Sequence, residues 1–300
     1  MSLIDPNINR IKNFNKKYLD HLSKNKSKKY KGPPPAIVEF DLHGSCSRRC
    51  AFCPRVDSKL WPNLEEQIDI KLYTKILNEL KEEWNFSGRI GWSGYSEPMM
   101  HSNILELIQI TKKILPNCNL EIVSNGDFLN QDKIKELYKT GLDHLRVSIY
   151  TNQKTTDKFL EIRKNLKIDP SIFFIRERNK GKKNEFGLVL NNRAGAVNLK
   201  KIGINKDQKF PLIRRCNFPL FKIFVNYNGD YQICSNDWNK KKIIGNAKKN
   251  SIDKIWYSSR FNFIRKNLMN KNRNIDPCKT CDVQGDLNGN EYYEEWKNLL

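Results

Sequence analysis

Residues 37–55 read IVEFDLHGSCSRRCAFCPR, an apolar segment that runs directly into three closely spaced cysteines. The alternation of apolar and polar residues over 37–43 predicts a β-strand, so Cys46, Cys50 and Cys53 leave the end of that strand in one loop. An odd number of thiols does not make a set of disulfides, and a structural zinc site normally takes four ligands. The loop therefore raises the question of what a site with three thiolates binds.

The composition limits the class of protein. The chain has 300 residues, of which 38% are hydrophobic, enough for one large domain or for one domain with a smaller appendage. No run approaches the roughly 18 to 20 apolar residues of a membrane span, and the first residues lack the apolar stretch and cleavage site of a signal peptide. We therefore expect a cytoplasmic protein with no membrane partner, whose eight cysteines are metal ligands or catalysts and not disulfides.

The net charge of +21 arises from 54 basic and 33 acidic residues. Such a charge favours anionic partners, including nucleic acid and phosphorylated substrates. Lysine also occurs throughout the chain beside asparagine and isoleucine, as in residues 239–250, which a genome-wide compositional bias would also produce. Charge alone therefore does not establish a function.

Strand-like and helix-like segments alternate from residue 37 to residue 176. Strands are predicted at 37–43, 89–93, 120–126, 143–150, 171–176 and 186–190. Helices are predicted at about 11–22, 66–84, 103–115 and 130–140, and from the end of the fourth strand to about 166. This alternation with short links predicts an α/β fold with a parallel sheet, here a partial (βα)6 TIM-like barrel. In such folds the loops at the carboxyl ends of the strands build the site.

The pattern changes after about residue 177. Residues 221–237, FKIFVNYNGDYQICSND, predict a β-hairpin around Asn228 and Gly229, and an aromatic-rich helix is predicted over 253–268. We therefore divide the chain into a basic N-terminal segment (1–36), a barrel (37–200) and a small cysteine-rich extension with the hairpin and helix (201–300).

The three-cysteine loop has a specific chemical capacity. Cysteines at a Cys-x3-Cys-x2-Cys spacing can ligate three irons of a four-iron cubane and leave the fourth iron open for a small molecule. With His43 as a fourth ligand, the same thiols would instead suit zinc. Polar turns follow the next two strands at 94–98 (GYSEP) and 124–126 (SNG), and VSI (147–149) lies within the fourth strand. Because parallel strands end at one rim, we expect these turns beside the cysteine loop.

These four segments resemble motifs of the radical S-adenosylmethionine (radical SAM) enzymes. Residues 46–53, CSRRCAFC, are similar to the three-cysteine signature, including the aromatic residue before the third cysteine. GYSEP resembles the Gly-Gly-Glu-Pro motif, with Glu97 offset by one residue, while SNG and VSI resemble the Thr-Asn-Gly and Val-Ser-Leu segments. The match covers roughly residues 37–175.

The resemblance implies roles for individual residues. Cys46, Cys50 and Cys53 would hold the [4Fe–4S] cluster that reductively cleaves SAM to a 5′-deoxyadenosyl radical, with a reductase such as flavodoxin or ferredoxin as electron donor. Glu97 or nearby backbone carbonyls would accept hydrogen bonds from the SAM amine, and Ser148 and Arg163 would meet its carboxylate. The other implied cofactor-binding residues are Gly94, Ser96, Ser124 and Asn125, while Arg48 and Arg49 are expected to line or solvate the cluster loop. A turn carboxylate and a solvated helix face are the plainer interpretations of Glu97 and Arg163.

A second set of cysteines lies in the extension. Cys216 precedes the predicted hairpin, Cys234 lies in its second half, and Cys278 and Cys281 form a Cys-x2-Cys pair. With the hairpin and the Gly-Asn pair at 245–246, they resemble a shortened SPASM extension of radical SAM enzymes. The resemblance implies one auxiliary [4Fe–4S] cluster ligated by all four, although four cysteines also suit zinc. Cys118 is interpreted as an unpaired thiol.

A fully ligated cluster can pass an electron but cannot bind a second SAM, which suits dehydrogenation, epimerisation or crosslinking. We therefore predict a radical SAM oxidoreductase or epimerase acting on a sugar, polyol or peptide; the short segment before the first strand favours the sugar or polyol. A radical SAM enzyme that modifies RNA is the alternative that the charge favours, although no RNA-binding module is evident. The third hypothesis is a non-catalytic iron–sulfur or zinc protein with a structural or sensor role. Two interpretations stay open for four further residues, which either face the substrate cavity or have plain loop roles: Asn192, Arg193, Asp237 and Trp238.

Overall fold

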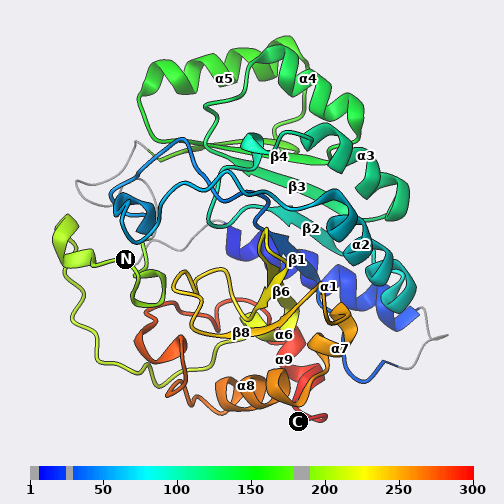
Figure 1. Ribbon diagram of the computed structural model, residues 1–300, viewed down its shortest axis with the longest axis vertical. Helices are drawn as coiled ribbons and strands as arrows, with labels where there is room; N and C mark the ends of the chain where they lie inside the picture. The colour runs from blue at the N-terminus through cyan, green and yellow to red at the C-terminus, as the bar shows by residue number, and fades with distance from the viewer. Residues whose placement is uncertain (1–6, 25–29, 179–189) are drawn as a thin grey trace.

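The computed structural model describes residues 7–24, 30–178 and 190–300. Within them one sheet contains eight strands in the order β5-β4-β3-β2-β1-β6-β7-β8. The strands are β1 (Ile37–Phe40), β2 (Arg89–Trp92), β3 (Asn119–Ser124), β4 (His144–Ile149), β5 (Phe173–Glu177), β6 (Lys222–Val225), β7 (Asp230–Gln232) and β8 (Ile243–Asn246). The pairs from β5 to β6 are parallel, and β7 and β8 are antiparallel to their neighbours. The sheet is curved and open, which confirms the partial barrel (Figure 1).

Helices cover the outer side of this sheet (Figure 1). The helices of the first half are α1 (Asn7–Lys24), α2 (Ile70–Trp84), α3 (Ile104–Ile114), α4 (Gln131–Thr140) and α5 (Gln153–Asn165). Those of the second half are α6 (Phe218–Phe221), α7 (Ile252–Trp256), α8 (Ser259–Met269) and α9 (Asn290–Trp296). None of the helices within the described ranges has both the length and the apolar character that crossing a membrane requires.

Capping residues explain where the helices begin and end. The Asp69 side chain accepts a hydrogen bond from the backbone N–H of Leu72, so α2 begins at Ile70 and not at 66 as predicted. Gly141, at φ 118°, ends α4 in the left-handed conformation, as the sequence predicts. The single aromatic helix predicted over 253–268 is wrong, because Ser258 caps a second helix by accepting from the N–H of Phe261.

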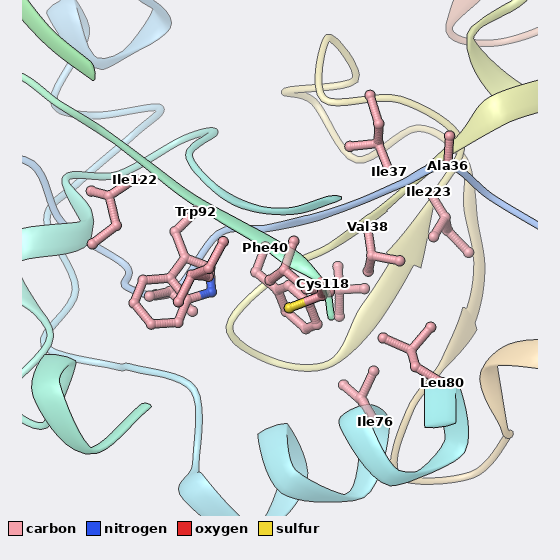
Figure 2. Close-up of a cluster of buried hydrophobic side chains, with 14 of the residues drawn as sticks. Ala36, Ile37, Val38, Phe40, Ile76, Leu80, Trp92, Cys118, Ile122 and Ile223 are labelled. Atoms are coloured by element: carbon pink, nitrogen blue, oxygen red, sulfur yellow. The ribbon is translucent and has the colours of Figure 1, made fainter. Parts of the chain in front are cut away.

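A hydrophobic core fills the space between the sheet and α2. Figure 2 shows Val38 and Phe40 of β1 on the side of the strand that faces Ile76 and Leu80 of α2. All four side chains are fully buried, as alternating strand positions against an apolar helix stripe require. Cys118 lies in the same cluster at 3% exposure, which is a packing role for this thiol.

The predicted hairpin is present and has an unexpected neighbour. Strands β6 and β7 pair on either side of Gly229, whose φ is 84°, but β6 also pairs in parallel with β1, Ile37 lying opposite Lys222. The extension therefore continues the barrel sheet and brings the end of β6 beside the cysteine loop. The strand predicted at 186–190 lies outside the described residues except for Leu190, which is buried and outside any strand. The domain boundary near residue 200 stays a prediction.

Candidate active site

The cysteine loop that follows β1 is held by a buried arginine. Arg55 is 3% exposed, and its guanidinium donates to the carbonyls of Gly44 (2.8 Å) and Tyr95 and to Oδ1 of Asn63 (3.1 Å). Asn63 in turn accepts from the N–H of Cys46 (3.3 Å) and donates to its carbonyl (3.1 Å). One cation thus joins the cysteine loop to the turn after β2. Sequence reasoning missed Arg55, although it stands two residues after the third cysteine.

The cysteine loop, the GYSEP and SNG turns and the end of β4 line one cavity at the carboxyl ends of the strands. Its lining includes nine of the ten residues predicted for the cluster and for SAM, namely Cys46, Cys50, Cys53, Gly94, Ser96, Glu97, Ser124, Asn125 and Ser148. The tenth, Arg163, lies in α5, where its guanidinium donates to the carbonyl of Phe173 (3.2 Å), so the structure does not bring it to this cavity. Tyr150, Arg193 and Trp238 also line the cavity, and of these Tyr150 was not predicted.

The three thiols lie close enough to affect one another's ionisation. Burial, followed by the proximity of Cys53 and Cys46, raises the pKa of Cys50 to about 11. Burial also raises the pKa values of Cys46 and Cys53. Such thiols become stable thiolates when a positively charged metal centre binds them. The donor set therefore fits a cluster.

No group of three or more His, Cys, Asp or Glu side chains in the described part of the chain is compact enough to hold a single metal ion. Four-iron clusters do not require such a group, since each cysteine ligates a different iron. The amide of Asn125 points its nitrogen at the Cys46 sulfur, 3.7 Å away. It also donates to the hydroxyl of Ser47 (2.9 Å), so the SNG turn supports the cysteine loop directly.

Glu97 ties the rim of the cavity together. Its carboxylate accepts from the N–H of Asn125 (2.7 Å) and from that of Met99 (3.2 Å), and its own N–H donates to the carbonyl of Ser45 (3.0 Å). Burial raises the pKa of this carboxyl to about 7. Glu97 is thus a buried link between three loops and not the surface carboxylate of the plainer interpretation.

The two arginines of the cysteine loop have different places. The guanidinium of Arg48 lines the cavity, forms an ion pair with Asp127 beyond the SNG turn and lies 5.6 Å from the ring centre of Tyr150. Arg49 donates to the carbonyl of Arg55 (2.7 Å). Arg48 therefore connects the first and third rim loops, while Arg49 supports the cysteine loop from outside the cavity.

Asp41 is a buried carboxyl beneath the GYSEP turn. It is 1% exposed, and its Oδ1 accepts from the N–H of Tyr95 (3.2 Å) and from the hydroxyl of Ser96. Its Oδ2 has no hydrogen-bond partner among the described residues. Burial raises the pKa of Asp41 from 3.8 to about 7, so this carboxyl keeps its proton to a higher pH than an exposed aspartate does.

This placement of Asp41 predicts a pH dependence of stability. Because the pKa of Asp41 is higher in the folded chain, the folded state binds more protons between about pH 4 and pH 7. We expect the contribution of Asp41 to the free energy of unfolding to fall by up to about 4 kcal/mol as the pH rises through this window. Anaerobic urea denaturation at several pH values should show a clearly smaller fall for Asp41→Asn; equal slopes for the two proteins would contradict this role.

The second cysteine set also forms one group. Burial raises the pKa of Cys216 to about 11 and that of Cys281 to about 12, and both thiols are further affected by Cys234. Burial and the other three thiols raise the pKa of Cys278. Gly285 leaves the necessary space, since a Cβ at this position would lie 2.2 Å from the sulfur of Cys216. The four thiols therefore fit a shared cluster.

A loop joins this group to the first cavity. Asn192 donates to the carbonyl of Thr280 (2.7 Å), beside the Cys-x2-Cys pair, while Arg193 donates to the side chain of Asn236 (3.2 Å) and lines the first cavity. Trp238 follows Cys234 by four residues, and its ring centre lies 4.5 Å from that of Tyr95. The second cysteine set is therefore adjacent to the cavity of the first.

Comparison with known proteins agrees with these motifs. Residues 42–173 match the model of the radical SAM superfamily, and residues 216–282 match that of the SPASM iron–sulfur cluster-binding domain. The curated S-adenosyl-L-methionine-dependent 2-deoxy-scyllo-inosamine dehydrogenase of Niallia circulans is 27% identical over 250 residues, covering 82% of this chain and 92% of that protein. The GTP 3′,8-cyclase of Aquifex aeolicus is 26% identical over 217 residues, covering 70% of this chain and 62% of its own length.

Solved structures show the same fold. The crystal structure of BtrN in complex with AdoMet and 2-DOIA aligns with a TM-score of 0.71 at 24% identity, over 84% of this chain and 95% of that chain. Streptococcus suis SuiB bound to precursor peptide SuiA aligns with a TM-score of 0.56 at 14% identity, over 83% and 70% of the two chains. The chain therefore carries a radical SAM domain and a SPASM domain, and it is an oxidoreductase-type enzyme that uses SAM and [4Fe–4S] clusters.

Proposed function

We propose that this enzyme oxidises a secondary alcohol of a polyol, aminocyclitol or sugar to a ketone. The observation that carries the proposal is the group of four thiols beside the cavity lined by the three-cysteine loop. A centre with four protein ligands has no open iron, so its contribution is electron transfer. The similarity over most of both chains to a protein named as a 2-deoxy-scyllo-inosamine dehydrogenase supports an alcohol as the reacting group.

Oxidation of a CH–OH group to C=O removes one hydrogen atom, one proton and one electron. When bound, the three-cysteine cluster and SAM supply the radical that takes the hydrogen atom, and the four-cysteine cluster supplies the acceptor for the electron. In this proposal Cys46, Cys50 and Cys53 hold the first centre. Cys216, Cys234, Cys278 and Cys281 hold the second.

The remaining work falls to polar side chains of the cavity. The GYSEP backbone and Ser148 are proposed to orient SAM, with Glu97 keeping the rim loops in register. Arg193 brings a cation to the part of the cavity nearest the second cysteine set, where it can bind the substrate oxygen and stabilise negative charge on it as the proton leaves. Trp238 and Tyr150 supply the ring surfaces beside it.

The direct test is anaerobic incubation of the reconstituted enzyme with SAM, dithionite and a panel of polyols, aminocyclitols and sugars, including 2-deoxy-scyllo-inosamine. We expect a ketone product by mass spectrometry and NMR, and transfer of deuterium from the carbinol carbon into 5′-deoxyadenosine. If the product is an epimer of the substrate and no ketone forms, the enzyme is an epimerase and the proposed oxidation is wrong. Reaction with peptides or RNA alone would overturn the choice of substrate class.

Arg193 and Arg163 provide a matched pair of substitutions. Arg193→Gln removes a charged hydrogen-bond donor from the cavity, so we expect kcat/KM for the alcohol to fall about 10- to 100-fold with both clusters retained. Arg163→Gln removes the same charge from the outer helix and should leave kcat/KM within about twofold. Steady-state kinetics of both variants check this, and a larger loss for Arg163→Gln would restore Arg163 to the SAM site.

Two partner assignments remain part of the proposal. A reductase such as flavodoxin or ferredoxin would supply the electron for SAM cleavage, and the small-molecule alcohol would enter from the cytoplasm. The electron donor can be examined by replacing dithionite with a purified flavodoxin system, which should support 5′-deoxyadenosine formation.

A further inference from the structure

A buried arginine lies among the four cysteines of the second set. Arg273 is 2% exposed and stands five residues before Cys278. Its guanidinium donates to the carbonyls of Arg214 (2.9 Å) and Arg215 (2.7 Å), which immediately precede Cys216. It also donates to the carbonyl of Val283 (2.8 Å), two residues after Cys281. One side chain therefore fixes both cysteine-bearing segments.

Among the residues that the structure describes, no carboxylate forms an ion pair with Arg273. Three acidic side chains of this region pair with other cations: Asp286 with Arg214 (2.8 Å), Asp282 with Lys206 (2.8 Å) and Asp276 with Lys279 (3.1 Å). The other carboxylate oxygen of Asp276 and of Asp286 has no hydrogen-bond partner among the described residues. Backbone carbonyls satisfy the N–H groups but do not neutralise the charge. Burying an uncompensated guanidinium is costly, so the charge needs an anion at this place.

The nearest segments that would carry negative charge with a bound cluster are those of the cysteines. The guanidinium donates to the carbonyl directly before Cys216 and to that of Val283, two residues after Cys281, so it lies beside both cysteine-bearing segments. Four thiolates around a [4Fe–4S] centre give a net negative charge, and that charge grows by one unit when the centre accepts an electron. A fixed cation in a buried site therefore stabilises the reduced form more than the oxidised form.

We propose that Arg273 sets the reduction potential of the auxiliary cluster, holding it high enough to accept the electron from the oxidised substrate. This inference rests on the assignment of the four cysteines in the proposed function. Arg273 acts here as a positioning and electrostatic residue, without touching substrate. The exposed Lys279, between Cys278 and Cys281, carries the same charge in solvent, where water and salt screen it.

The test uses the full chain with Cys46, Cys50 and Cys53 all changed to alanine, so that only the second cluster remains. EPR-monitored redox titration then gives its midpoint potential. We expect Arg273→Gln to lower the equilibrium constant for reduction at least tenfold, equivalent to about 59 mV for one electron. Arg273→Lys should retain most of the potential, and Lys279→Gln should change the constant less than about twofold.

The outcomes separate this inference from the function on which it rests. An Arg273→Gln protein that keeps its cluster and an unchanged potential would overturn the role of Arg273, with the four-cysteine site intact. Loss of the cluster from the glutamine variant, with cluster and potential kept by the lysine variant, would support a requirement for the charge. Loss of the cluster from both the glutamine and the lysine variant would mean that Arg273 acts only through its hydrogen bonds to backbone carbonyls, which would overturn the electrostatic role. A parent protein without a second cluster would instead remove the four-cysteine assignment.

Discussion

Cys50→Ala is expected to abolish SAM cleavage while the protein keeps its fold and about half of its iron. The substitution removes one of the three thiolates that would hold the first cluster. The four cysteines of the extension, which would hold the second cluster, are unchanged. Anaerobic reconstitution should give about four irons per chain in place of about eight. The yield of 5′-deoxyadenosine with dithionite should fall to background.

The matched control is Cys118→Ala. Cys118 is a buried thiol in the core between the sheet and its helices, so its loss should cost about 1–2 kcal/mol of stability and leave iron content and SAM cleavage unchanged. If Cys50→Ala unfolded the chain instead of abolishing only its activity, the three-cysteine site would have a structural role, as the non-catalytic hypothesis requires.

Gly285→Ala is expected to separate SAM cleavage from product formation. The new Cβ would lie 2.2 Å from the sulfur of Cys216 and 3.1 Å from its Cβ, so the thiol must leave its present position. We expect the second cluster to be lost and ketone formation to fall at least about 100-fold. 5′-Deoxyadenosine should still form, because the first site is unaffected. Iron analysis and product quantification on one sample measure both effects.

Gly91→Ala provides the matched control for this substitution. Gly91 lies in β2, and a Cβ added there has nothing within 4 Å. The variant should therefore keep about eight irons and its ketone product. A Gly285→Ala enzyme with both clusters and full product formation would show that Cys216 is not a ligand of the second centre.

The barrel and its reactive rim could be predicted from the sequence because each part has a local signal. Strand and helix periods differ, Gly141 marks a helix end, and the cysteine loop and polar turns follow successive strands. Parallel strands end at one rim, so order along the chain was sufficient to bring Cys46, Glu97 and Ser148 to one cavity.

The parts that could not be predicted depend on contacts between distant segments. The pairing of β6 with β1 joins residues about 185 positions apart, Ile37 with Lys222, and no local pattern encodes it. The sequence does not distinguish Arg55 and Arg273 from surface arginines. Only the structure shows that they are buried and donate to backbone carbonyls. Arg163 illustrates the converse, since its helix position gives no indication of which way its side chain points.

The most direct test of the central claim is a single anaerobic experiment on the reconstituted wild-type enzyme. Iron and sulfide are counted, and 5′-deoxyadenosine is then measured after addition of dithionite, SAM and a polyol deuterated at the carbinol carbon. We expect about eight irons, a ketone, and deuterium in 5′-deoxyadenosine. An enzyme with both clusters that never forms 5′-deoxyadenosine, or forms it without taking deuterium from any alcohol, would contradict the proposed oxidation.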